Sequence, residues 1–476
     1  MSTLAAPHPQ TAADSRFRLT FTERIGYASG DLACSMYWAV FAQFLMFFYT
    51  DVVGLGVASV ATMFAVTRLW DTMFDPVMGL IADRTRSRHG RYRPWLLWTI
   101  VPMVASGILT FTVPDVSTGA KLVYVYVTYT LVCMVYSALN LPYAALMGVM
   151  TPDTQERTVL SSFRYVGSFS GNLVVQFSLL SLVAWFGRGN DQFGYPCAIA
   201  LYGALAAALL VFTFWSTRER VQAPVDAPSG TIWSDMRNLG RNRPWVVLAL
   251  VVAITLIWIS IRSAVTIYYF KYYIGNQALV SSFLGLGTIG AVTGIVCTKW
   301  FVRIAGDKRR AFIGVNIIAG LSALCMYFLG PNDIVAIFCL AFVGAFLCGP
   351  LMPLMFAMFA DTADYGEWKF GRRTTGLIFA AGTASLKLGW AVGSALGGWL
   401  LYYYGYHANV VQNAEMLTGF RALMSWIPAL FAGVGAIMVF FYSIDSKTEQ
   451  AMGADLAARR AGNPALAGGA REGLGT

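Results

Sequence analysis

Two aspartates lie four residues apart inside an apolar stretch that leads into a dense basic segment. They are Asp71 and Asp75 of RLWDTMFDPVMGLIADRTRSRHGRYRPW, residues 68–95. Residues four apart share one face of a helix, so the two carboxylates can converge on one cation. Since buried acids are costly without a use, we predict that this pair binds Na+ or H+. The structural alternative is that Asp75 satisfies a backbone kinked at Pro76 and that Arg68 neutralises Asp71.

A third acid, Asp31, lies within the first apolar stretch, and Trp38 follows seven residues later on nearly the same helix face. A carboxylate that accepts hydroxyl hydrogen bonds beside an indole ring is typical of a sugar pocket. We predict that Asp31 binds the sugar and takes part in cation binding. The alternative is that Asp31 pairs with an arginine to fasten helices and that Trp38 is core or lipid-facing bulk.

Polar residues of the fourth and fifth apolar stretches are candidates for the same cavity. Tyr136 and Asn140 lie one turn apart, and Arg164 follows in SSFRYVGSFSG. An arginine inside a helical bundle needs an anionic partner, so we place Arg164 in the cavity, with a cytoplasmic gate as the alternative. Gly167 and Gly171 indicate a close helix contact and not a ligand site.

The second half of the chain contributes Lys387, with Thr383 one turn before it and Trp390 about one turn after. A lone ammonium inside a membrane must face acids, so Lys387 closes a charge network and releases its partner when the cation arrives. The alternative is a static salt bridge. We expect Thr383 and Trp390 to line the substrate site with it.

Arg262 has apolar residues on both sides in WISIRSAVTIYYFKYY. Either it donates to the substrate, which admits an acidic solute, or it pairs with Asp361 or Asp364. Charged residues near the ends of spans are expected to form a gating network: Arg68, Asp83, Arg84, Asp361 and Asp364.

The composition places the chain in a membrane. Of 476 residues, 57% are hydrophobic and 12% charged. The net charge of +10 comes from cations in short loops and not from a continuous stripe, so no nucleic-acid partner is expected. The polar first twenty residues lack the pattern of a removable signal peptide, and the seven cysteines are interpreted as small buried hydrophobes.

About twelve apolar stretches are long enough to cross a bilayer as helices. Six lie in the first half, at residues 26–49, 57–82, 94–113, 122–150, 159–185 and 195–215. Six lie in the second half, at 244–273, 281–304, 311–329, 334–360, 376–404 and 422–442. We predict an all-α membrane protein of two pseudo-symmetric six-helix bundles, residues 1–215 and 244–442, with a linker at 216–243 and a tail at 443–476 that begins as a short helix.

The cations follow the even-numbered spans, which predicts that both termini face the cytoplasm. The two halves also echo each other, because the basic loop at 79–93 has a shorter counterpart at 306–310. The connection at 151–164 matches the one at 360–373 in position and polarity. Parallel repeats of this kind are expected of a transporter that rocks two bundles around a midplane site.

Signatures of enzymes are missing from the sequence. It contains neither a phosphate-binding GxxxxGK(S/T) loop nor an HExxH motif nor a GxSxG elbow. His8, His89 and His407 all lie outside the predicted spans, which argues against a histidine proton relay. We expect neither an enzyme nor a cofactor beyond the coupling ion.

With these residues in hand, the chain resembles the glycoside-pentoside-hexuronide cation symporter family of the major facilitator superfamily. The resemblance covers nearly the whole chain. The resemblance depends on seven motifs, which occur in this order: YTDVVGL, WDTMFDPVMG, RSRHGRYRPW, NLPYAAL, ERTVLSSFR, IYYFKYYIG and ADTADYGEWK.

The resemblance implies a fold of twelve transmembrane helices, a cation site at Asp71 and Asp75, and an acid at Asp31 that couples sugar to cation. It also implies that Arg164, Lys387, Tyr136, Asn140 and Thr383 line the sugar cavity. Melibiose-transporting members of the family have asparagine at the position of Phe74, aspartate at Asn140 and tryptophan at Ala144, so melibiose specificity is not implied.

We therefore predict an inner-membrane symporter that takes up a sugar or glycoside with Na+ or H+ by alternating access. The nearest alternative is a transporter of a lysolipid or another amphiphile with the same fold. A non-transporting membrane receptor is an alternative from another class, and a membrane enzyme is the weakest. The sequence leaves the sugar, the ion and the oligomeric state open.

Overall fold

The computed structural model describes residues 19–151, 153–220, 237, 239–370 and 375–460. All regular elements in these ranges are helices, apart from one isolated bridge between Ser87 and Gly90. The chain divides into two compact units, Met1–Leu55 with Trp70–Asp226, and Gly56–Leu69 with Ala227–Thr476. The change from the first unit to the second after Asp226 falls within the expected linker.

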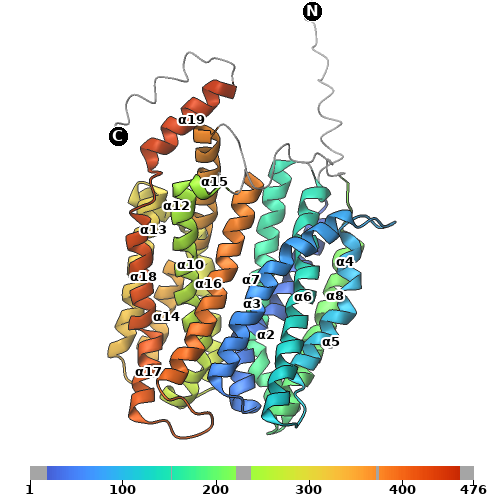
Figure 1. Ribbon diagram of the computed structural model, residues 1–476, viewed down its shortest axis with the longest axis vertical. Helices are drawn as coiled ribbons and strands as arrows, with labels where there is room; N and C mark the ends of the chain where they lie inside the picture. Colours follow the sequence, from blue (N-terminus) through green and yellow to red (C-terminus); the bar gives the residue numbers. More distant parts are fainter. Residues whose placement is uncertain (1–18, 152, 221–236, 238, 371–374, 461–476) are drawn as a thin grey trace, which may run out of the picture. The chain divides into compact units, whose positions relative to one another are not determined.

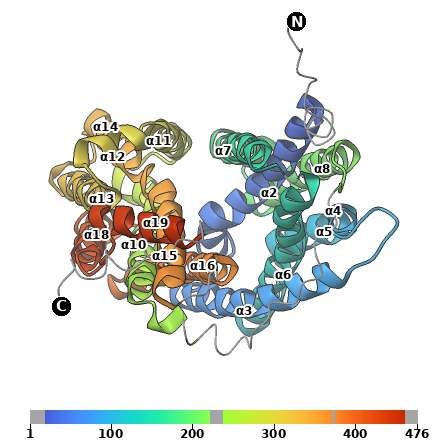
Figure 2. The same cartoon turned by 90° about the horizontal axis from the view of Figure 1, so that it is seen from above.

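The first unit is built from long helices that pack side by side. They are α2 (Phe21–Phe47), continued by the π-helical turn η2 (Phe48–Val52), α3 (Val57–Arg84), of which the part from Trp70 belongs here, α4 (Arg93–Trp98), α5 (Ile100–Phe111), α6 (Thr118–Met150), α7 (Thr154–Gly187) and α8 (Asp191–Ser216). Helix α2 packs against both α7 and α8, as Figure 2 shows in blue and green.

The second unit contains the helices α10 (Arg243–Tyr268), η3 (Tyr269–Ile274), α11 (Leu279–Val296), α12 (Thr298–Ala305), α13 (Lys308–Cys325), η4 (Met326–Phe328), α14 (Ile334–Cys348), α15 (Leu351–Phe370), α16 (Thr375–Tyr403), α17 (Ala414–Met424), α18 (Trp426–Val439) and α19 (Ser446–Arg460). Helix α10 packs against α16 and α18, and α13 packs against α14 and α18 (Figure 1). The short helix α19 confirms the helix expected after residue 443, and the tail beyond residue 460 lies outside the described residues.

Eleven helical spans in the described part of the chain are long and apolar enough to cross a membrane. Helix α3 is not among them, although its 28 residues would reach about 42 Å at 1.5 Å per residue. Arg68, Asp71 and Asp75 lower its hydropathy. The helix expected at 57–82 is therefore present. Its charged residues, among them the candidate cation ligands Asp71 and Asp75, make it less apolar than the other spans.

The last membrane span begins earlier than predicted. Helix α17 begins at Ala414, capped by Asn413 Oδ1, which accepts from Met416 N at 2.8 Å, whereas the predicted span began at 422. The predicted span therefore left out Arg421. Arg421 instead lies within α17, and its guanidinium donates to the carbonyl of Tyr327.

A pair of glycines four residues apart brings two helices into close contact in each unit. A Cβ at Gly167 or Gly171 of α7 would lie 2.2 Å from the carbonyl oxygen of Ala28 or 2.5 Å from that of Leu32 on α2. The interpretation of these two glycines as a helix contact is thus confirmed. In the second unit, Gly389 and Gly393 of α16 meet α10 in the same way, with a Cβ 2.6 Å and 2.5 Å from backbone carbonyls. The equivalent spans of the two units therefore use the same packing device.

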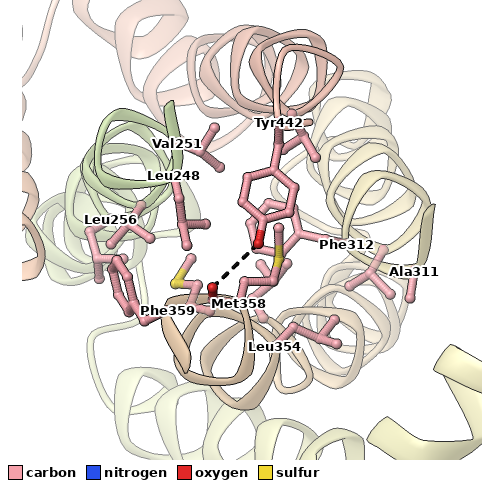
Figure 3. Close-up of a cluster of buried hydrophobic side chains, with 14 of the residues drawn as sticks. Leu248, Val251, Leu256, Ala311, Phe312, Leu354, Met358, Phe359 and Tyr442 are labelled. Atoms are coloured by element: carbon pink, nitrogen blue, oxygen red, sulfur yellow. Dashed lines mark hydrogen bonds between the residues drawn. The ribbon is translucent and has the colours of Figure 1, made fainter. Parts of the chain in front are cut away.

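The second unit has an apolar core at the ends of α10, α13, α15 and α18. Buried side chains of Leu248, Phe312, Leu354 and Phe359 meet there, and Tyr442 reaches in from the segment after α18. Figure 3 shows the hydroxyl of Tyr442 donating to the Met358 carbonyl, at 3.3 Å. This hydrogen bond satisfies the phenol inside an apolar cluster.

Candidate functional site

Asp31 and Arg164 form an ion pair between α2 and α7. Arg164 Nε lies 3.3 Å from Asp31 Oδ1, and the side chains are 8% exposed for Asp31 and 27% for Arg164. The guanidinium carbon also lies 5.5 Å from the ring centre of Tyr143 on α6. The structure therefore brings two predicted site residues together and gives Asp31 the arginine partner that was the structural alternative.

Two tyrosines brace the helices beside this ion pair. The rings of Tyr27 on α2 and Tyr143 on α6 stack with their centres 4.7 Å apart. Each hydroxyl donates to the backbone carbonyl of the other residue, at 3.3 Å from Tyr27 and 2.6 Å from Tyr143. This reciprocal arrangement fixes the part of α2 that carries Asp31.

A row of polar side chains continues from the ion pair along the contact between α2 and α7. Ser35 and Ser168 share a hydrogen bond of 2.6 Å between their hydroxyls. Farther along, Gln43 donates to Asn172 at 3.5 Å and accepts from Gln176 at 3.4 Å. The α7 members recur every four residues from Arg164, which places them on one face of the helix.

Trp38 lies on α2 as predicted and stacks on Tyr136 of α6. Their ring centres are 4.5 Å apart and the planes are inclined by 27°. Both side chains are partly exposed. Asn140, one turn after Tyr136, is also partly exposed, so the aromatic pair and the amide lie on accessible parts of the first unit.

Asp71 and Asp75 converge on one hydroxyl. Ser137 Oγ of α6 lies 2.8 Å from Asp71 Oδ1 and 2.8 Å from Asp75 Oδ1. Asp71 is 4% exposed and Ser137 is 3% exposed. The two carboxylates therefore share one buried partner, as their spacing predicts, and Ser137 is the part of this cluster that the sequence did not reveal.

The predicted residues of α16 have different surroundings from one another. Lys387 is partly buried, and the hydroxyl of Thr383 donates to the Phe379 carbonyl at 2.9 Å, within its own helix. Trp390 packs against the apolar core of the second unit, and its carbonyl accepts from Ser260. Trp390 thus has a packing role in this structure.

Arg262 does not pair with either predicted acid. Its Nη2 atom lies 3.4 Å from Met326 Sδ, and it forms no ion pair within the described part of the chain. Asp361 instead pairs with Lys308 at 2.7 Å, and Lys308 also reaches Glu449 of α19 at 2.9 Å. The alternative in which Arg262 pairs with Asp361 or Asp364 is therefore wrong, and Lys308 in the first turn of α13 is the partner of Asp361.

The other gating residues lie at the end of α3 and in α15. Asp83 and Arg84 are exposed, and Asp83 accepts from the Tyr92 hydroxyl at 2.7 Å. Partial burial raises the pKa of the Tyr92 hydroxyl most, and this hydrogen bond to Asp83 raises it further. Arg68 and Asp364 are partly buried in α3 and α15.

Glu219 organises the basic loop after α3, a role that the sequence did not suggest. Its carboxylate accepts from the backbone N–H groups of Arg91, Tyr92 and Arg93 at 2.7–3.0 Å. The first N–H groups of a helix lack partners within it, and a carboxylate there is favourable. Glu219 therefore pins this loop to the segment that follows α8.

The described residues contain no group of three His, Cys, Asp or Glu side chains that could hold a transition metal. A sodium ion has different needs, since it is bound by oxygen ligands such as carboxylates and hydroxyls. Asp71, Asp75 and Ser137 supply such oxygens within one cluster, in which Asp71 and Ser137 are buried and Asp75 is partly exposed. This donor set fits a small hard cation or a proton.

The chain is similar to known transport proteins over most of its length. Residues 26–446 match the family model described as "MFS/sugar transport protein". The putative glycoside/cation symporter YagG of Escherichia coli is 35% identical over 91% of this chain and 94% of its own length. The isoprimeverose transporter of Lactiplantibacillus pentosus is 34% identical over 98% of both chains.

Solved structures agree on the fold. A bacterial homologue of the human lysosomal transporter Spinster superposes with a TM-score of 0.64 at 13% identity, covering 94% of this chain and 99% of that one. Nucleoside transporter NupG superposes with a TM-score of 0.57, also at 13% identity, over 90% of this chain and all of its own.

The helices and these matches define a secondary transporter of the major facilitator superfamily. The chain belongs to the MFS/sugar transport protein family, and the predicted relation to the glycoside-pentoside-hexuronide symporters is confirmed. It is a multi-pass membrane protein.

Proposed function

We propose that this protein is a cation-coupled symporter that carries a sugar or glycoside across the inner membrane by alternating access, with both termini in the cytoplasm. The full-length relatives named as a glycoside/cation symporter and an isoprimeverose transporter support this assignment. The observation that carries it is the convergence of two acids, Asp71 and Asp75, on the buried hydroxyl of Ser137.

Proton counting supports the cation site. Ser137 has one hydroxyl hydrogen, and two carboxylate oxygens lie within hydrogen-bond distance of its Oγ. The hydroxyl can donate to only one of these oxygens at a time, so the three side chains together offer more acceptors than donors. We place the coupling cation at these oxygens, either as Na+ or as a proton.

The sugar site is assigned to the first unit at Asp31, Arg164, Trp38 and Tyr136. A carboxylate accepts hydroxyl hydrogen bonds, a guanidinium donates them, and stacked rings pack against the C–H face of a sugar. A sugar hydroxyl that enters between Asp31 and Arg164 can replace part of their ion pair. Asn140 extends this surface along α6. Thr383 and Lys387 are proposed as substrate contacts of the second unit.

The alternative of a lysolipid or other amphiphile transporter predicts an apolar substrate path. Its support is weaker, because the polar row from Arg164 to Gln176 is better suited to a hydroxylated solute. We infer a transport role and not catalysis, in line with the family.

The coupling experiment compares Asp75→Asn with wild type in proteoliposomes. We expect Asp75→Asn to lose concentrative uptake driven by a Na+ or H+ gradient while retaining sugar exchange. The control is Asp115→Asn, because Asp115 is exposed and pairs only with Lys121 among the described residues. Full concentrative uptake by Asp75→Asn would refute the coupling role.

A further inference from the structure

Arg262 is a partly buried charge that forms no ion pair with the described residues. It lies near the middle of the Arg243–Ile274 span, and the only hydrogen bond of its guanidinium within the described residues goes to the weak acceptor Met326 Sδ at 3.4 Å. A guanidinium inside a membrane protein normally faces an anion, because an unpaired charge there is costly. The structure therefore raises the question of what neutralises Arg262.

A second donor lies one turn before it on the same face of α10. Trp258 is 1% exposed, and its indole Nε1 has no hydrogen-bond partner in the described part of the chain. An indole N–H can only donate. Two donor groups four residues apart thus both lack an oxygen acceptor.

This side of α10 faces the interior of the second unit. A Cβ at Gly344 of α14 would lie 3.8 Å from Arg262 Nη1 and 2.8 Å from Ser322 Oγ of α13. One turn before Trp258, the hydroxyl of Thr255 lies beside Gly435 of α18. A side chain at Gly344 would therefore clash with Ser322 and adjoin the guanidinium.

The same interior holds an amide without partners. Asn316 of α13 is fully buried, and neither its Nδ2 nor its Oδ1 atom has a hydrogen-bond partner in the described residues. It lies at the level of Thr255, since a Cβ at Gly435 would be 3.2 Å from Asn316 Nδ2 and 3.8 Å from Thr255 Oγ1. Unsatisfied buried polar groups in native proteins call for an unseen water or ion.

Taken together, the interior is rich in donors and carries a positive charge. Arg262 offers five N–H groups and Trp258 one. The nearby acceptors described above are all uncharged: the Met326 thioether, the Asn316 amide oxygen and the hydroxyls of Ser322 and Thr255. Water alone leaves the guanidinium charge uncompensated. We propose that a small monovalent anion binds at Arg262 and Trp258, with hydrating water reaching Asn316.

The anion has two sources of the same chemistry. It is either free chloride or the carboxylate of the transported solute, and the second source rests on the proposed function. The two sources differ in what binds without any sugar present. A chloride site is filled in salt solution, whereas a solute site needs an acidic sugar.

Thermal unfolding of the purified full-length protein in detergent distinguishes these sources. Sodium chloride, sodium glucuronate and neutral xylose are titrated at constant ionic strength, with sodium sulfate as the balancing salt. A ligand that binds only the folded state raises the unfolding midpoint in proportion to the logarithm of its concentration above the Kd. We expect one of two results. A higher unfolding midpoint with chloride assigns the site to a free anion. A higher midpoint with glucuronate alone assigns the site to the carboxylate of the solute.

The variants test whether Arg262 and Trp258 hold the anion. Arg262→Gln should abolish the response, and Arg303→Gln, which alters an exposed arginine of α12, should retain it. If Arg262→Gln does not fold, Trp258→Phe keeps an aromatic ring and should raise the apparent Kd at least about tenfold through the lost hydrogen bond to a charge. No response to either anion, or an unchanged response in both variants, would overturn the proposal.

Because chloride binding is measured without transport, failure of sugar uptake would leave this result standing. Equally, a missing anion response would leave the symporter assignment intact. The two proposals therefore fail independently.

Discussion

Arg164 on α7 binds Asp31 on α2, with Nε 3.3 Å from Oδ1, and this ion pair occurs on the helix pair that also carries Arg24 and Glu156. Arg24 and Glu156 are 2.8 Å apart, and their side chains are 25% and 13% exposed. Both are arginine–carboxylate pairs, but their neighbours differ. Only the Asp31–Arg164 pair adjoins the polar row that continues through Ser168.

The first prediction concerns sugar binding. Asp31→Asn should reduce sugar uptake to a few per cent of wild type, because it removes the carboxylate acceptor and leaves Arg164 without an anion. Arg164→Lys should be nearly as damaging, since an ammonium does not reproduce the planar guanidinium fork. Uptake of labelled sugar and its binding to purified protein both measure this.

Glu156→Gln is the matched control, because it breaks the other ion pair between the same two helices. It should lower stability modestly and retain sugar affinity. Equal loss of sugar affinity in Glu156→Gln and Asp31→Asn would show that Asp31 only fastens the helices.

The second prediction concerns the cation. Ser137→Ala should weaken cation affinity by about 10- to 100-fold, because a hydrogen bond to a charged group contributes about 1.5–3 kcal/mol. Ser137→Thr keeps the hydroxyl and should remain near wild type. The measurement is the cation concentration or pH that gives half-maximal sugar uptake, and an unchanged midpoint in Ser137→Ala would remove Ser137 from the site.

The sequence predicts the acids of this cluster and not the serine. The spacing of Asp71 and Asp75 alone places both on one face of a helix. Ser137 is a common small residue, and only the packing of α6 against α3 shows which face of α6 meets the acids. The sequence offers one signal for Ser137: it lies next to Tyr136 and three residues before Asn140, two residues that were predicted to face the cavity.

Charge partners were predicted less well than helices. The length of the apolar stretches identified the spans. The ion pairs of Asp361, however, depend on where the first turns of α13 and α19 lie in the folded unit. Lys308 begins α13 and Glu449 lies in the first turn of α19, so three separate segments meet at Asp361.

The third prediction concerns the glycine contact between α2 and α7. Gly171→Ala should destabilise the protein by about 1–3 kcal/mol, because the new Cβ would meet the Leu32 carbonyl oxygen at 2.5 Å and the Met36 nitrogen at 2.9 Å. The thermal unfolding midpoint in detergent measures the effect.

Gly148→Ala serves as its control. A Cβ at Gly148 in α6 meets nothing within 4 Å, so this change should be neutral or stabilise the helix by up to about 1 kcal/mol. Equal destabilisation by both substitutions would show that helix contact at Gly171 is not the cause.

The fourth prediction concerns pH and the helix α19. Asp445 precedes this helix, and its Oδ1 accepts from the backbone N–H of Thr448 at 2.9 Å and from its hydroxyl at 2.7 Å. These two hydrogen bonds lower the pKa of Asp445. Because the folded-state pKa lies below the unfolded value of about 3.9, the cap stabilises α19 above that value and is lost as the pH falls through the folded-state pKa.

Hydrogen exchange at residues 446–450 measures this cap. Asp445→Ala should speed exchange there about fivefold at neutral pH, in line with the roughly 1 kcal/mol that a lost cap costs. Asp445→Asn keeps a neutral acceptor, so it should stay near wild type at neutral pH and show no extra opening below pH ~4 after correction for the intrinsic exchange rate. Wild-type exchange in Asp445→Ala would mean that α19 is held by the bond from Trp368 Nε1 to Asp455 Oδ2, 2.6 Å long, and not by its first turn.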